Sequence, residues 1–186
     1  MDEIMDLYDA NRQKTEKTYI RGTAQPKGFY RMVVHVCIFN SEGELLIQQR
    51  TYNKKMPGLW DVTCGGAVST CESSAIGAQR ELFEELGIKI DFTNIRPSLT
   101  ANFPLGFDDF YVLHADINLD DLILQEEEVA DARWENLEGV LALRRANKFV
   151  NYKESFLRFL FDLSLDNRYV ETVSYTHLTL PTSELV

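Results

Sequence analysis

The residues best suited to chemistry in this chain are three glutamates, Glu81, Glu84 and Glu85. On a helix, positions i, i+3 and i+4 share one face, so the spacing predicts that the three carboxylates project together. Like charges repel unless something positive compensates them, and Arg80, four residues before Glu84, can offset one. Mg²⁺ and Mn²⁺ prefer carboxylate oxygen, so the pattern indicates a divalent metal site. Three glutamates alone would also suit a solvated acidic helix face.

The segment that must position these glutamates is expected to be one helix over residues 73–86. It contains no proline, and its apolar residues recur at helical spacing. Gly87 is the expected end of the helix, because glycine commonly follows the last turn. Either Ser69 together with Glu72, or Ser73 alone, is the expected cap at its start.

A glycine pair, Gly65 and Gly66, precedes the helix. Glycine lets the backbone approach a ligand closely and present a carbonyl oxygen to a metal. Gly66 is followed after five residues by Glu72, and after seven more by the run Arg80-Glu81-Leu82-x-Glu84-Glu85-x-Gly87-Ile88. This arrangement resembles the signature of the Nudix hydrolases at every fixed position, and the resemblance extends over roughly residues 30 to 165.

The resemblance implies an enzyme that hydrolyses a diphosphate linked to another group, commonly in a nucleoside diphosphate derivative. It implies that Glu84 and Glu85 bind the metal directly and that Glu81 acts as general base or as a further ligand. We expect the carboxylates of Glu84 and Glu85 at the surface. The carbonyl of Gly65 would complete the ligand set. Glu72 and Arg80 would orient the carboxylates. Metal ions neutralise a diphosphate and lower the pKa of an attacking water, which a nearby carboxylate can then deprotonate.

Several residues outside the signature are candidates for substrate contact. Arg50 is the candidate phosphate contact at the end of a strand, whereas Lys54 and Lys55 resemble ordinary solvated loop charges. One of the glutamates in residues 126–128 could supply a further metal ligand or base, although a solvated acidic loop has the same pattern. His35 lies in an apolar strand and is expected to be a core residue. Four aromatic residues could line a pocket or fill the core: Phe103, Phe107, Phe110 and Trp134.

Two other functions fit the same fold. Residues 6–11, 33–40 and 57–60 resemble Nudix proteins related to type I isopentenyl-diphosphate isomerases, which use a catalytic cysteine and a histidine-rich metal site. The cysteine position falls on Gly65, with Cys64 one residue early, and two histidine positions fall on Ala67 and Arg31.

These departures favour hydrolysis over isomerisation. A one-residue shift that brought Cys64 into the site would weaken that preference. A ligand sensor with a Nudix fold and no turnover is the third alternative, but such proteins typically lose signature residues that are all present here.

Composition narrows the function further. The net charge of −10 over 186 residues argues against a general nucleic-acid binder. The resemblance implies a small-molecule diphosphate as the partner. No apolar run is long enough to cross a membrane, and the acidic first six residues are unlike a signal peptide. Cys37, Cys64 and Cys71 lack zinc-finger spacing and are expected to be reduced thiols in a cytoplasmic protein.

Strands interleaved with a few helices indicate an α/β domain, and the resemblance specifies a Nudix fold, a mixed sheet sandwiched between helices. Residues 1–30 are expected to form a hairpin and entry segment of this domain, and residues 31–172 its main part. Expected strands are 18–21 in the hairpin and 32–39, 44–49, 99–103, 109–117 and 132–135, with a loop from Pro57 to Gly65. Expected later helices are 136–147 and 153–165, and the second is expected to turn Phe159 toward the core. The resemblance also allows a homodimer.

The last residues, 173–186, are expected to be non-native. Residues 173–182 resemble the translation of a transposon-based sequencing adapter, which places the end of the selected sequence near Thr172. The alternative is a short β-like tail, because alternating threonine and leucine can form a strand.

Overall fold

The centre of the molecule is a mixed β-sheet. The computed structural model describes residues 3–52 and 55–165. Within these ranges the sheet consists of β3 (Arg31–Phe39), β4 (Leu45–Arg50), β5 (Trp60–Asp61), β6 (Cys64–Ala67), β7 (Leu99–Phe103), β8 (Gly106–His114) and β9 (Val129–Glu135). The order is β5-β4-β3-β8-β7, with β6 paired to β3 and β9 to β4. β3 and β8 are parallel, and the other pairs are antiparallel.

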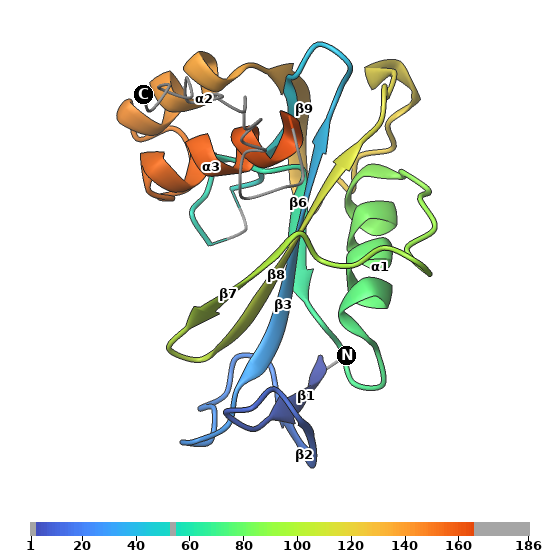
Figure 1. Cartoon of the computed structure of the whole chain (residues 1–186), viewed down its shortest axis with the longest axis vertical. Helices are drawn as coiled ribbons and strands as arrows, with labels where there is room; N and C mark the ends of the chain where they lie inside the picture. The colour runs from blue at the N-terminus through green and yellow to red at the C-terminus, as the bar shows by residue number, and fades with distance from the viewer. Residues whose placement is uncertain (1–2, 53–54, 166–186) are drawn as a thin grey trace, which may run out of the picture.

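Helices cover both faces of this sheet (Figure 1). The helix α1 (Ser74–Leu86) lies on one face, and α2 (Leu137–Arg145) and α3 (Glu154–Leu165) lie on the other. Side chains alternate along a strand, so β3 supplies Val34 and Val36 to the α1 face and Cys37 and Phe39 to the opposite face. The predicted α/β fold, a mixed sheet between helices, is therefore confirmed.

An N-terminal hairpin of β1 (Ile4–Tyr8) and β2 (Lys14–Ile20) closes one end of the sheet (Figure 1). The carboxylate of Asp6, 5% exposed, accepts hydrogen bonds from the hydroxyl of Thr70 and the backbone N–H of Cys71, and pairs with Lys14. The hairpin thus holds the loop that leads into α1. Burial would raise the pKa of Asp6, but the bonds from Lys14, Cys71 and Thr70 outweigh it and lower that pKa.

Most predicted elements lie within a few residues of the observed ones, and three differ. β2 begins at Lys14, four residues before the predicted residue 18. β8 spans 106–114 instead of 109–117, because its parallel partner β3 ends at Phe39, opposite His114, and leaves nothing to pair with beyond that point. On α3, Phe159 was expected to face the core, but it is 39% exposed and Leu157 packs inward instead.

The glycine pair differs from the prediction in its setting. The chain from Pro57 to Gly65 was expected to be a loop, but Trp60–Asp61 and Cys64–Ala67 are short strands. Gly65 pairs with His35, and Gly66 with Val34. The glycines therefore have fixed positions on the sheet.

Residues 173–186 lie outside the described ranges, as does Thr172. Among the described residues, no helix combines the length and the apolar character that a membrane span requires.

Candidate active site

Local sequence signals position α1, which carries the glutamates. The side chain of Ser73 caps its start by accepting a hydrogen bond from the N–H of Ile76. Its end is Gly87, whose φ of 71° is left-handed and suits glycine. Of the two predicted caps, Ser73 is the one observed. The hydroxyl of Ser69 does not cap the helix. The backbone N–H of Ser69 donates to the carboxylate of Glu72 at 3.0 Å.

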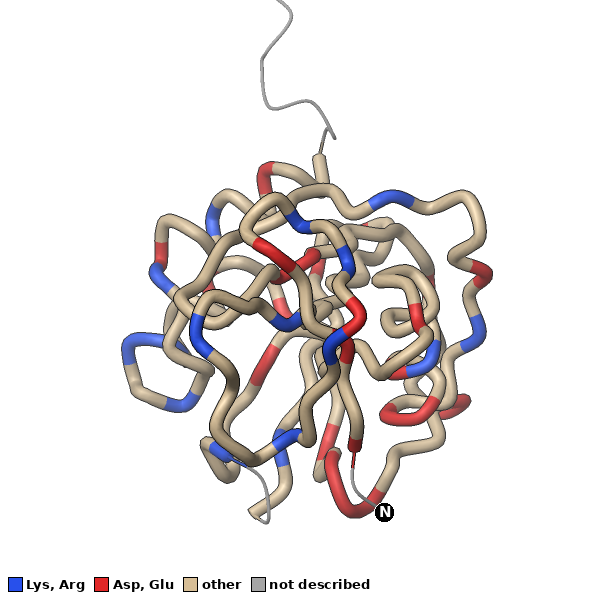
Figure 2. The backbone as a smooth tube through the Cα atoms, turned by 90° about the horizontal axis from the view of Figure 1, so that it is seen from below, with Lys and Arg blue, Asp and Glu red and all other residues tan. Residues whose placement is uncertain are grey.

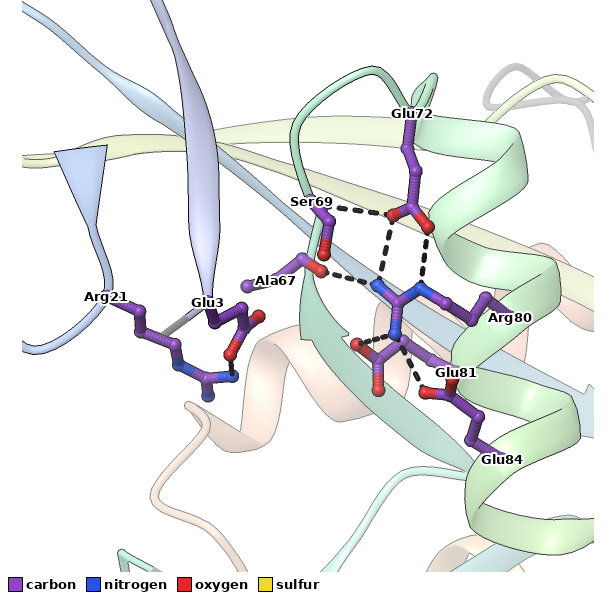
Figure 3. A network of polar contacts seen from close by, with 8 residues as sticks. All are labelled: Glu3, Arg21, Ala67, Ser69, Glu72, Arg80, Glu81 and Glu84. Atoms are coloured by element: carbon purple, nitrogen blue, oxygen red, sulfur yellow. Dashed lines mark hydrogen bonds and ion pairs between the residues drawn. The ribbon is translucent and has the colours of Figure 1, made fainter. Parts of the chain in front are cut away.

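One arginine organises the carboxylates (Figure 3). Nε and Nη2 of Arg80 donate to the two oxygens of Glu72 at 2.7 and 3.1 Å, and Nη2 also donates to the carbonyl of Ala67 at 2.9 Å. Nη1 donates to both Glu81 and Glu84, at 2.9 Å each. A bidentate guanidinium bond fixes direction as well as distance, so Arg80 and Glu72 hold each other while Arg80 offsets the charge of the next two carboxylates.

The glutamates differ in their exposure. The side chain of Glu84 is 48% exposed, but Glu81 and Glu85 are only 8% and 3% exposed. Glu85, expected at the surface, is buried because it faces β4, where Nε2 of Gln48 donates to it at 2.8 Å. Burial, and then the charge of Glu81, raise the pKa of Glu85. Burial also raises the pKa of Glu81, which Arg80 offsets only in part.

The glycine pair separates two spaces on opposite sides of β6. A Cβ atom at Gly66 would overlap the carboxyl group of Glu81, and one at Gly65 would overlap the ring of His35. Successive residues of a strand face opposite ways, so Gly66 adjoins the space beside α1 and Gly65 the space behind the strand. Both positions require glycine because a side chain there would displace a neighbour.

The space beside α1 is a polar cleft of about 300 Å³, here called the acidic cleft. It brings together most of the predicted site residues. Its lining consists of Glu3, Arg21, Gly65, Gly66, Ser69, Glu72, Arg80, Glu81, Glu84, Gln125 and Glu128. Of the run 126–128, only Glu128 reaches the cleft, where its charge raises the pKa of both Glu81 and Glu85.

The chemistry of the acidic cleft fits a hard divalent cation. Carboxylates and the Gly65 carbonyl supply only oxygen donors, which Mg²⁺ and Mn²⁺ prefer. Oε1 of Gln48, next to Glu85, is buried and accepts no hydrogen bond from the described residues. In the described ranges no three acidic, His or Cys side chains converge into a ready cage, because Arg80 holds Glu81 and Glu84. A cation would therefore bind after these carboxylates turn from Arg80.

Behind β6 lies a larger cavity of about 620 Å³, here called the cationic cavity. It shares Arg21, Gly65 and Gly66 with the acidic cleft. The predicted phosphate contact Arg50 lines this cavity, apart from the other site residues, and donates to Asp61 at 3.0 Å and to the carbonyl of Lys55 at 2.9 Å. The predicted site residues therefore divide between two adjoining spaces.

The cationic cavity also contains residues that were not predicted to belong to the site. Its charged and polar lining includes Arg21, Arg31, His35, Lys55, Asp108 and Tyr152. His35 was expected to be a core residue, but its ring is 20% exposed and its Nδ1 lies 2.7 Å from Asp108. The missed signal is the alternation along β3, which places Arg31, Val33 and His35 on one face. Of the four aromatic candidates, Phe103 lines the cavity, and the others pack in or against the core.

The cysteine expected of an isomerase does not reach either space. Cys64 is fully buried and packs in the core under α1. Burial, and then the charge of Glu85, raise its pKa well above the ordinary value, so its thiol stays protonated.

Comparisons with known proteins agree with these features. A family model for the NUDIX domain matches residues 29–158. An uncharacterized Nudix hydrolase of Listeria innocua is 44% identical over 162 residues, covering 87% of this chain and 95% of that protein. An isopentenyl-diphosphate Delta-isomerase of Serratia proteamaculans is 32% identical over 96 residues, 51% of this chain and 53% of the isomerase. The crystal structure of DR0079 from Deinococcus radiodurans has a TM-score of 0.70 and 25% identity, covering 85% of this chain and 99% of that one.

Proposed function

Because the chain belongs to the Nudix family and has isomerase-like relatives, we propose that it is a Mg²⁺- or Mn²⁺-dependent diphosphohydrolase acting on a small diphosphate, such as a nucleoside diphosphate derivative. The observation that carries this proposal is the arrangement of Glu72, Glu81 and Glu84 around Arg80 in one cleft, directly beside a cavity large enough for a small molecule.

The glutamates and the Gly65 carbonyl have different roles in the proposed hydrolysis. A bound divalent cation would neutralise the diphosphate and lower the pKa of the attacking water. Glu84 and Glu85, with the Gly65 carbonyl, would hold that cation. Glu81, which faces the cleft at its inner wall, would take the proton from the water onto a carboxylate oxygen. Glu128 could serve as a further ligand or as an alternative base.

Arg80 and Glu72 are positioning residues in this scheme. Their double hydrogen bond and the bond to the Ala67 carbonyl tie the middle of α1 to β6. Removing either partner would let Glu81 move relative to Gly66, and groups that orient reactive residues typically contribute 10- to 100-fold.

Isomerisation is the second candidate, and the geometry disfavours it. Position 65 has no side chain, and Cys64 is buried with a raised pKa. A sensor without turnover is disfavoured because the chain keeps every charged residue of the signature.

A small-molecule substrate also agrees with the charge distribution. Acidic and basic positions are interspersed in Figure 2, without one broad basic face of the kind that nucleic-acid binding requires. We therefore propose no nucleic-acid partner. A homodimer stays a prediction, which light scattering can test.

The experiment is a substrate panel with purified protein and Mg²⁺. It should contain nucleotide sugars, dinucleoside polyphosphates, ADP-ribose, nucleoside diphosphates and isopentenyl diphosphate. We expect release of phosphate or nucleotide that EDTA abolishes and that Glu84→Gln reduces strongly. Conversion of isopentenyl to dimethylallyl diphosphate without phosphate release would instead establish an isomerase. Binding of panel members without any turnover would establish a sensor.

A further inference from the structure

The cationic cavity extends away from the acidic cleft along one face of β3. Arg31, Val33 and His35 share this face. His35 is paired with Gly65, at the junction with the cleft, whereas Arg31 is paired with Gly106, at the far end. Four residues of extended strand span about 13 Å. Arg31 is therefore too far from the junction to contact a diphosphate held there, but it could contact another part of the same molecule.

Arg31 is held in place by neighbours that do not neutralise it. Its Nη1 donates to Oε1 of Gln25 at 2.8 Å, and Nε2 of Gln25 donates to the carbonyls of Phe29 and Leu105 at 2.7 and 2.8 Å. The guanidinium also lies over the ring of Phe103, at 5.2 Å from its centroid. These contacts fix the plane of the guanidinium and leave donors for a ligand.

The charge of Arg31 distinguishes it from the other arginines of the cavity and from His35. Arg21 pairs with Glu3 at 2.7 Å, Arg50 pairs with Asp61 at 3.0 Å, and His35 faces Asp108. Within residues 3–52 and 55–165, no carboxylate oxygen lies within 4.0 Å of the Arg31 guanidinium nitrogens, so Arg31 forms no ion pair there. A preorganised guanidinium without a carboxylate partner is suited to bind an anion of the ligand.

We propose that Arg31, oriented by Gln25 and Phe103, is a subsite for a second anionic group of the substrate, a phosphate monoester remote from the diphosphate that is cleaved. The inference rests on the proposed function, because that function places the diphosphate at the acidic cleft. It predicts a substrate class: diphosphates whose departing half carries an additional phosphate. A guanidinium binds such a group with two parallel hydrogen bonds, which a lysine cannot reproduce.

The test uses pairs of probes that differ by one remote phosphate. Coenzyme A and 3′-dephospho-coenzyme A form one pair, and NADPH and NADH form the other. We expect the protein to hydrolyse the phosphorylated member with a kcat/KM at least about tenfold higher, as one charge-assisted pair of bonds provides. Arg31→Met keeps much of the apolar stem and should abolish this preference through KM, while activity on the other member stays unchanged. Arg31→Lys should restore only part of it.

Two controls separate the subsite from general effects. Lys27→Gln removes a positive charge from the exposed loop before β3, outside the lining of the cavity, and it should leave the preference for the phosphorylated probe intact. Thermal unfolding of the Arg31 variants should match that of the unmodified protein, since Arg31 is not part of the core.

A binding measurement keeps the subsite testable independently of turnover. Calorimetry should show tighter binding of adenosine 3′,5′-bisphosphate than of AMP, and Arg31→Met should equalise them. Turnover with equal rates for both members of each pair would overturn the subsite and leave the hydrolase standing. A binding preference that depends on Arg31, without any turnover, would overturn the hydrolase and leave the subsite standing. A preference that survives in Arg31→Met would also overturn the subsite.

Discussion

The acidic cleft and the cationic cavity lie on opposite sides of the same short strand, yet they are built in different ways. Apart from Glu3, Arg21, Gln125 and Glu128, the cleft comes from residues 65–84, a single strand-loop-helix segment. The cavity draws on the N-terminal hairpin, β3, the β4–β5 loop, the β7–β8 turn and the segment before α3. Under the proposed function, the reactive groups are therefore arranged locally, while the surface that would select the substrate is assembled by the whole fold.

The two spaces also differ in charge. Carboxylates outnumber cations in the cleft, so its charge suits a metal ion together with a diphosphate, as proposed. Cations outnumber carboxylates in the cavity, so its charge suits an anion. Variants on the two sides should therefore change different kinetic constants, kcat for the cleft and KM for the cavity.

The largest effect is expected from Glu85→Gln, at the buried glutamate next to the cleft. Loss of this carboxylate should lower kcat on the order of 10³-fold, because it removes a group that holds the catalytic charge. Stability should not fall, because the amide replaces a buried carboxyl group and can still bond to Gln48. Steady-state kinetics and thermal unfolding measure both. The matched control is Glu138→Gln on the exposed surface of α2, and full activity in Glu85→Gln would refute the site.

Alanine substitutions at Gly65 and Gly66 test most directly whether the cleft and the cavity have different roles. Gly66→Ala should lower kcat about 100-fold, because its methyl group displaces the carboxyl group of Glu81, and a shift of about 1 Å can have that effect. Gly65→Ala adds the same methyl group on the opposite face, against His35, and should raise KM with a smaller change in kcat. Each variant should lose about 1–3 kcal/mol of stability through overpacking. Equal effects on kcat in both would contradict the division.

A smaller effect is expected from Arg50→Gln in the cavity. Losing one charged hydrogen-bond donor to the substrate should raise KM about tenfold and leave kcat nearly unchanged. Arg50→Lys should recover part of the affinity because the charge returns without the fork. Arg96→Gln removes an exposed arginine that lines neither space and is the control. A large fall in kcat with constant KM would show that Arg50 acts in the chemical step instead of in substrate binding.

The smallest effect concerns the hairpin that borders both spaces. Asp6→Asn should lower the free energy of unfolding at pH 7 by about 1–2 kcal/mol, because it weakens the bonds to Lys14, Thr70 and Cys71. The folded-state pKa of Asp6 lies below the ordinary 3.8, so its contribution is complete above that pH and is lost as the pH falls through the folded-state value.

Urea unfolding at several pH values between 7 and 3 measures this contribution. The difference between Asp6→Asn and the unmodified protein should shrink at the acid end. Glu16→Gln, on the exposed side of the same hairpin, should show no difference at any pH. A difference that is constant with pH would mean that the Asp6 charge does not stabilise the hairpin.

The sequence predicted the cleft better than the cavity for a physical reason. Helical periodicity and the caps at Ser73 and Gly87 act within a few residues, so α1 and the side-by-side position of its glutamates could be predicted. The sequence could not predict the burial of Glu85, because this burial depends on contact with Gln48 of β4, which lies 37 residues away in the chain. The partnership of His35 with Asp108 depends on the parallel register of β3 and β8, which no local pattern encodes.

The fold class was predicted for the same local reasons, through strands and helices of clear periodicity. The short strands β5 and β6 were missed, since two- and four-residue strands have too few residues to show alternation and contain glycine. The pairing of β6 with β3 could not be predicted from the sequence. This pairing places the two glycines between the cleft and the cavity.

The shared nitrogen of Arg80 has a consequence for ion selectivity. Nη1 bridges Glu81 and Glu84, so an incoming ion competes with a built-in guanidinium for the same oxygens. A monovalent ion that displaces it exchanges one positive charge for another and gains nothing. A divalent ion doubles the charge at that point. If activity depends on Mg²⁺, as proposed, the arginine should disfavour the binding of sodium and potassium, and those ions at cellular abundance should change that activity little.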